Sequence, residues 1–186
     1  VLGPQTRHAQ VGCLVLSMSY RNPALLSAMA RVLDHATGGR LILGVGAGWY
    51  ARDYHEYGYV LGTAGERLKN LERGQKIILD RWQRDNPKPV RGTIPILVGG
   101  GGERVTLRIT AQYADLWNGF GPPGTFRHKN AVLNDWCRKV GRDPSAIVRT
   151  VTIDHYDLDR LDEYVAAGAA HLILRLHAPF DFAPVQ

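Results

Sequence analysis

Cysteine is scarce in this chain, which has only Cys13 and Cys137 among its 186 residues. The two cysteines lie far apart and match no spacing of a metal-binding or redox motif. Cys13 falls within an apolar run, so we expect it to behave as a small buried hydrophobic residue. This low usage is typical of a reducing compartment, and we therefore expect a cytoplasmic protein.

Long hydrophobic runs are also missing. No apolar run approaches the roughly 20 residues of a membrane helix, and residues 1–8 lack the apolar segment of a secretory signal. Basic residues outnumber acidic ones by 23 to 17, a formal charge of +6, but they are scattered and form no recognition module for nucleic acid. We expect neither a membrane nor a nucleic acid as partner, whereas the positive charge permits an anionic ligand.

Motifs for metal binding and for a nucleophile are absent too. None of the seven histidines pairs at a helical metal spacing with a carboxylate nearby, so we expect no metal. Ser17 and Ser19 lie in no nucleophile motif, which argues against a serine hydrolase. No glycine cluster continues into Gly-Lys-Ser or Gly-Lys-Thr, which argues against hydrolysis of nucleoside triphosphates.

Two glycine clusters, each directly after an apolar run, are the strongest features that the chain does have. The first is LILGVGAGW at residues 41–49 and the second is PILVGGGGE at residues 95–103. Short apolar runs bounded by glycine are typical of buried strands, and glycine lets the backbone approach a ligand. The first cluster is not a dinucleotide fingerprint, because Trp49 stands where that motif needs its third glycine.

Strands and helices are predicted to alternate along the chain. The expected strands are residues 11–16, 41–44, 96–98, 115–118, 148–153 and 171–176. The expected helices are residues 24–36, 63–82 (opened by a Thr63–Glu66 capping box), 104–113, 126–140 and 158–167. Such alternation predicts an α/β fold with a parallel sheet, either doubly wound or a (β/α)8 barrel. The polar loop 83–93 looks like the boundary between two halves.

These segments together resemble the luciferase-like oxidoreductases, and most closely the subgroup that uses the deazaflavin coenzyme F420. The matching stretches are residues 14–26 (LVLSMSYRNPALL), 38–49, 57–58 (YG), 95–103, 114–118 (ADLWN) and 140–144 (VGRDP). The resemblance implies a TIM barrel of the bacterial luciferase type in which the visible strands are the third to the eighth. The first two strands are then absent, so residues 1–186 form a single partial barrel domain. We expect the functional protein to be longer, and a homodimer.

The resemblance also implies that the loop after the strand at 96–98 holds the cofactor's phosphate end. The loop residues are Gly99, Gly100, Gly101 and Gly102, followed by Glu103 and a helix. This placement makes physical sense, because glycines let the backbone curl around an anion and a helix N-terminus adds partial positive charge. The alternative interpretation is a tightly packed strand-to-helix turn.

Further contacts with the cofactor ring are implied for the other strand ends. Family members often carry a non-proline cis peptide near Leu14 and Val15, with Ser17 just beyond it. Gly46, Ala47 and Gly48 would bring the backbone close to the ring. Trp49 would flank the ring or the substrate, or serve the core or a dimer contact, and Asn118 would contact a ligand at its strand end. The roles of two further residues stay open. His55 would lie at the site or be a solvated loop residue, and Arg175 would neutralise a phosphate or form a salt bridge on the lower or outer face of the barrel.

The implied activity is an oxidoreductase that transfers a hydride between F420 and a small organic substrate. One alternative is a monooxygenase of the same family that uses FMN and oxygen. Another is a flavin- or deazaflavin-binding barrel without catalysis. The proton donor of family members comes from the second strand or from the position of Trp49, and tryptophan cannot transfer a proton. The sequence therefore indicates no catalytic residue.

Overall fold

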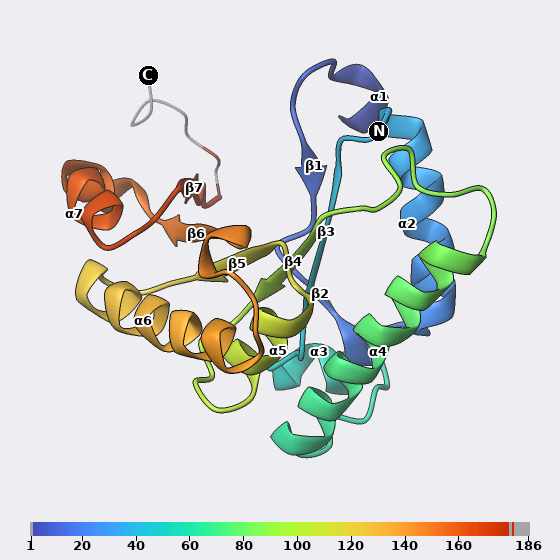
Figure 1. Cartoon of the computed structure of the whole chain (residues 1–186), viewed down its shortest axis with the longest axis horizontal. Coiled ribbons are helices and arrows are strands. Elements are labelled where there is room, and N and C mark those ends of the chain that lie inside the picture. Colours follow the sequence, from blue (N-terminus) through green and yellow to red (C-terminus); the bar gives the residue numbers. More distant parts are fainter. Residues whose placement is uncertain (1, 179, 181–186) are drawn as a thin grey trace. The chain divides into compact units, whose positions relative to one another are not determined.

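Parallel strands joined by helices run through the computed structural model, which describes residues 2–178 and 180 (Figure 1). The chain forms two compact units, Val1–Gly99 and Gly100–Gln186. The expected α/β alternation is confirmed in both. The structure does not test the prediction of a single domain. No helix in the described part of the chain has the length and apolarity needed to cross a bilayer.

The first unit is built around strand β3. Its elements are α1 (Leu2–Gln5), β1 (Val11–Gly12), β2 (Leu16–Ser17), the 3-10 helix η1 (Met18–Tyr20), α2 (Pro23–Thr37), β3 (Leu41–Gly46), α3 (Ala51–Glu56), α4 (Ala64–Arg84) and β4 (Ile96–Gly99). β1 pairs with the beginning of β3 and β2 with its end, both in parallel. β4 also pairs with β3 in parallel. The carboxyl ends of β2, β3 and β4 therefore lie at one edge of this sheet.

Helices α2 and α4 begin and end where local signals place them. The Asn22 side chain accepts hydrogen bonds from the first turn of α2, and Gly38, with φ of +64°, ends that helix in the left-handed conformation. The predicted capping box of Thr63 and Glu66 is present at the start of α4. The two helices pack together, with the Trp82 indole N–H donating to the Ser27 carbonyl.

The second unit places β6 between two parallel neighbours. Its elements are α5 (Thr106–Tyr113), β5 (Leu116–Gly119), α6 (Pro123–Lys139), η2 (Pro144–Ala146), β6 (Val148–Ile153), η3 (His155–Arg160), α7 (Leu161–Ala166) and β7 (His171–Leu174). β5 and β7 pair with β6. Its core contains the stacked rings of Trp117 and Phe126, 5.1 Å apart, together with Leu133 and Val151.

Two predictions about the first strand were wrong. Residues 11–16 do not form one strand: β1 (Val11–Gly12) and β2 (Leu16–Ser17) pair separately with β3, and residues 13–15 between them belong to no strand. The Cys13 carbonyl lies in the space that a side chain at Gly44 would need, so Gly44 permits this close approach. Cys13 is exposed rather than buried, whereas Cys137 is buried in the second unit's core. An apolar run alone does not say which of its residues another element covers.

The loop at residues 83–93 is not a boundary, since the division between the units follows Gly99. Buried side chains of α2 hold this loop inside the first unit. The Asp34 carboxylate accepts the Val90 N–H at 2.8 Å, and Arg31 donates to the Pro87 carbonyl at 3.0 Å. The prediction of one helix over residues 158–167 was also inexact. The 3-10 helix η3 ends at Arg160, and α7 covers only Leu161–Ala166.

Candidate functional site

Val15 fills the space between the glycines that end β3 and β4. A Cβ at Gly46 would lie 2.8 Å from Val15 Cγ2, and one at Gly99 would lie 3.1 Å from Val15 Cγ1. These glycines are therefore required by packing within the first unit, whatever else approaches them. The Leu14–Val15 peptide bond is cis, as the resemblance implied. Leu14 itself is exposed.

Ser17 is held by a residue that the sequence did not single out. Its Oγ lies 3.1 Å from the hydroxyl of Tyr54, which belongs to α3 and is buried. Both hydroxyls occupy the space where a side chain at Gly48 would stand, and Gly48 has φ of +81°. The Ala47 carbonyl accepts weak hydrogen bonds from Tyr54 and Ser19. Helix α3 is too short for its hydrophobic period to be recognised, so no sequence signal pointed to Tyr54.

Trp49 is exposed over 81% of its surface and meets the Tyr50 ring edge to face at 5.3 Å. It follows β3 directly, at the carboxyl edge of the first unit's sheet. A core role for Trp49 is thereby excluded, and contact with a ligand or a second chain stays a prediction. His55 is exposed on α3.

In the second unit, the backbone from Gly101 to Thr106 presents a run of N–H groups. The Gly100 N–H donates to the Asn118 carbonyl at 3.2 Å, and the Leu107 N–H donates to the Gly102 carbonyl at 3.0 Å. Among the described residues, no acceptor takes a hydrogen bond from the N–H groups between these two positions. No side chain caps α5. The loop therefore offers consecutive donors at a helix N-terminus, the arrangement that suits an anion.

The Glu103 side chain serves to hold this loop against α6. Its carboxylate accepts from Lys129 Nζ at 2.5 Å and lies 3.1 Å from His128 Nε2, and these two partners lower its pKa. The Glu103 carbonyl accepts from the Trp136 indole. On the other side, the Trp117 indole donates to the Gly100 carbonyl at 2.8 Å. Two buried or half-buried tryptophans thus fix the loop, which sequence reasoning did not foresee.

Asn118 is engaged within the sheet. Its amide oxygen accepts from the hydroxyls of Thr150 and Thr152, and its amide nitrogen donates to Thr152 at 3.1 Å. The residue is only 5% exposed. Its side chain therefore ties β5 to β6, while contact between Asn118 and a ligand stays a prediction.

A charged cluster that the sequence did not reveal lies where β6 and β7 end. The buried Asp154 carboxylate accepts two hydrogen bonds from Arg175 and one from Tyr156, and it lies 2.9 Å from His177 Nε2. The Arg175 guanidinium, foremost, holds the pKa of Asp154 well below its usual range. Arg175 thus makes a salt bridge, but at the carboxyl ends of β6 and β7 rather than on the lower or outer face of the barrel, and its contact with a phosphate stays a prediction. Among residues 2–178 and 180, no cluster of three or more His, Cys, Asp or Glu side chains could hold a metal ion.

Comparison with known proteins settles the family. The pattern of the family named luciferase-like monooxygenase matches residues 1–183. The chain belongs to this family. An uncharacterized protein of Mycobacterium tuberculosis is 26% identical over 197 residues, which cover 98% of this chain and 67% of that protein.

Solved structures agree with this assignment of the luciferase-like fold. An F420-dependent secondary alcohol dehydrogenase in complex with an F420–acetone adduct superposes with a TM-score of 0.81 at 15% identity, over 92% of this chain and 75% of its own. The oxygenating constituent of 3,6-diketocamphane monooxygenase from Pseudomonas putida, in complex with FMN, gives a TM-score of 0.65 at 19% identity, over 86% and 54%. The expected fold class, the barrel of the luciferase-like enzymes, is confirmed.

Proposed function

We propose that this luciferase-like protein is an oxidoreductase that transfers a hydride between coenzyme F420 and a small organic substrate. The observation that carries the proposal is the run of N–H groups from Gly101 to Thr106, which have no acceptor among the described residues. Backbone N–H groups at a helix N-terminus bind phosphate well, because both the hydrogen bonds and the helix dipole favour an anion. F420 and FMN each carry a phosphate group.

We propose the following contacts with the cofactor, taken separately in each unit. The N–H groups of Gly101 to Thr106 would bind its phosphate, with the loop held in place by Glu103, Lys129 and the two tryptophans. The cofactor ring would be contacted by Leu14, Val15, Ser17 and the backbone of Gly46 to Gly48. The exposed Trp49 would exclude water from the ring. When bound, the deazaflavin supplies the hydride, and the protein supplies binding and orientation.

The choice of F420 over FMN draws on two observations. Of the two solved structures compared above, the F420-dependent alcohol dehydrogenase has the higher TM-score. The formal charge of +6 on this chain also suits the polyanionic tail of F420. The family name and the FMN-bound neighbour favour the second candidate, an FMN-dependent monooxygenase that uses oxygen. A barrel that binds its cofactor without catalysis is the third. We also propose a cytoplasmic location and no nucleic acid or membrane partner.

The test is a titration of the full-length protein with F420 and, separately, with FMN, followed by fluorescence quenching. Gly101→Asp and Gly101→Asn form a matched pair, since a Cβ at Gly101 meets only Lys129 carbons, at 3.8 Å or more. Asp places a negative charge among the donors, so we expect about tenfold weaker binding than with Asn. If the two variants bind the cofactor equally tightly, the proposal that this loop binds its phosphate is contradicted.

The two titrations separate the candidates. Preferential binding of F420, with its oxidation or reduction by a small alcohol or carbonyl compound without oxygen, supports hydride transfer. Preferential binding of FMN with oxygen-dependent turnover supports the monooxygenase. Binding of F420 without turnover of any substrate tried supports the non-catalytic barrel, and binding of neither cofactor overturns the proposal.

A further inference from the structure

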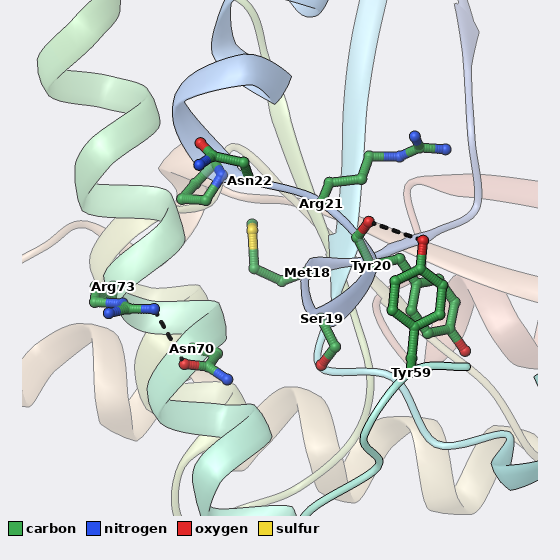
Figure 2. A pocket seen from close by; sticks show the side chains of 9 residues that line it. Met18, Ser19, Tyr20, Arg21, Asn22, Tyr59, Asn70 and Arg73 are labelled. Atoms are coloured by element: carbon green, nitrogen blue, oxygen red, sulfur yellow. Dashed lines mark hydrogen bonds between the residues drawn. The ribbon is translucent and has the colours of Figure 1, made fainter. Parts of the chain in front are cut away.

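A pocket of about 350 Å³ lies in the first unit, between η1, the start of α2 and one side of α4. Figure 2 shows Met18 at its centre, with Asn70 and Arg73 of α4 facing it and Asn22 at its upper edge. We call it the Met18 pocket. It is lined by Met18, Ser19, Tyr20, Arg21, Asn22, Pro23, Tyr59, Asn70 and Arg73.

The pocket is formed by specific packing of η1. Gly74 has no side chain, and any Cβ there would collide with Met18, so Met18 can lie directly against α4. On the opposite side the Tyr20 ring stacks on Tyr59 at 4.6 Å, and the Tyr59 hydroxyl donates to the Tyr20 carbonyl. These contacts hold η1 beside α4, so the floor of the pocket is fixed by packing, while the side chains of Asn22, Asn70 and Arg73 at its rim are exposed.

The lining is rich in hydrogen-bond donors and contains no carboxylate. Arg73 makes one long hydrogen bond, 3.5 Å to the Asn70 amide oxygen, and no carboxylate among the described residues lies within 4.0 Å of it. The Asn22 amide oxygen is used by the N–H groups of Ala24 and Leu25, which leaves its NH2 group for another acceptor. In Figure 2 the Arg21 guanidinium points away from α4, so Arg73 supplies the charge at the pocket.

A second hollow lies next to the Met18 pocket, and the two share Ser19 and Asn70 as lining residues. It contains Glu66, but that carboxylate accepts the N–H and hydroxyl of Thr63 in the capping box. It also contains Lys69, which forms no ion pair with any described residue. Lys69 and Arg73 are four residues apart on α4 and so lie on one face. Glu66 lies close enough to Lys69 for their charges to interact, so Lys69 is partly neutralised. The positive charge of Arg73 has no such carboxylate partner among the described residues.

We propose that the Met18 pocket binds an oxyanion, the phosphate or carboxylate group of a small-molecule ligand. Arg73 would donate two parallel hydrogen bonds to it, as guanidinium groups commonly do to carboxylate and phosphate. The free amide groups of Asn22 and Asn70 would donate further bonds, and Lys69 would add long-range attraction. The proposal concerns residues outside the glycine loop and does not depend on which cofactor that loop binds.

Methionine labelling provides the test, since Met18 lines the pocket and Met29, the other methionine in these 186 residues, does not. Full-length protein carrying 13C-labelled methionine methyl groups is titrated with inorganic phosphate, and in a second series with acetate, at constant ionic strength. The Met18 signal is identified by its loss in Met18→Leu. We expect it to shift saturably, while the signal of Met29, which lies on α2 outside the pocket, stays in place.

Two variants with the same change in net charge test whether the shift of the Met18 signal results from anion binding in the pocket. Arg73→Gln should weaken binding about tenfold, the loss expected for hydrogen bonds to a charged group. Arg84→Gln changes the net charge equally on the same helix but lines neither hollow, and should leave binding unchanged. A response to phosphate alone or to acetate alone supports the site and identifies the preferred group. No saturable Met18 shift with either anion, or equal weakening by both variants, overturns the proposal.

Discussion

At the residue scale, Val15 shows why glycine recurs at the ends of neighbouring strands. Its side chain packs against both Gly46 and Gly99, at distances that leave no room for a Cβ at Gly46. Interiors are packed densely enough that one added methyl group forces a displacement. The glycines that first indicated a cofactor site are thus also a packing requirement of the first unit.

We expect Gly46→Ala to lower the free energy of unfolding by about 1–3 kcal/mol, the usual cost of overpacking. The effect is measured by urea denaturation of the full-length protein. The same change in a Val15→Ala background should cost much less, because the colliding methyl groups are gone. Equal cost in the two backgrounds contradicts the packing explanation.

Asp154 is the residue whose protonation should matter most for stability. Its pKa is lowered in the folded protein, chiefly by Arg175, so the carboxylate stabilises the fold above its unfolded pKa of about 3.9. That contribution is lost as the pH falls below this value toward the folded pKa. Because Arg175 and His177 are more than half exposed, solvent screens part of the interaction.

Asp154→Asn should therefore lower the free energy of unfolding by about 1–2 kcal/mol at neutral pH. The difference from the wild type should narrow as the pH is lowered below about 4. Denaturation curves at several pH values measure both effects. Asp159→Asn, at an exposed carboxylate of η3, is the control and should change little. A difference that does not vary with pH contradicts the role of the Asp154 charge.

At the scale of elements, α4 depends on its first turn. The Thr63 hydroxyl accepts the Glu66 N–H, and the Glu66 carboxylate accepts the Thr63 N–H at 2.7 Å. The backbone hydrogen bond to Thr63, followed by the side-chain one, lowers the pKa of Glu66. The same helix presents Asn70 and Arg73 to the Met18 pocket, so the cap helps to position that pocket.

Thr63→Ala should cost about 1 kcal/mol of stability, the usual value for loss of an N-cap. Urea denaturation measures this cost, and hydrogen exchange should show faster opening of the first turn of α4. Thr93→Ala is the matched control, because Thr93 is exposed in a loop and makes no hydrogen bond with the described residues. If both variants lose the same stability, the capping box does not explain it.

At the scale of the whole molecule, α2 carries a stripe of exposed apolar side chains. Leu25, Met29 and Val32 have exposed fractions of 60%, 40% and 69%. Their spacing of four and three residues puts them on one face of the helix. Contiguous exposed apolar surface commonly marks a contact with another chain. This stripe supports the homodimer that the family resemblance led us to expect, and which we propose.

The full-length protein should sediment as a dimer. Val32→Glu should shift it toward the monomer, because a charge buried in an interface is costly. Val165→Glu places the same charge at an exposed apolar residue of α7 and should leave the dimer intact. A wild-type protein that sediments as a monomer contradicts the proposal, and equal dissociation by both variants excludes the α2 stripe as the contact.

The sequence by itself determined the elements whose signals are local. The helix predicted at residues 24–36 is α2 to within one residue at each end, the Thr63–Glu66 box begins α4, and β6 was predicted with its observed limits. These predictions succeeded because caps, turns and hydrophobic periods involve residues a few positions apart. The six family motifs, taken in order, also led to the correct fold class.

Only the tertiary structure decided which residues meet across the chain. Tyr54 holds Ser17, the two tryptophans hold the glycine loop, and Asp154 joins Arg175. Each contact joins residues from different elements, and no local period encodes such a pairing. The exposure of Cys13 has the same origin, because burial depends on what packs against a strand and not on the strand's own composition.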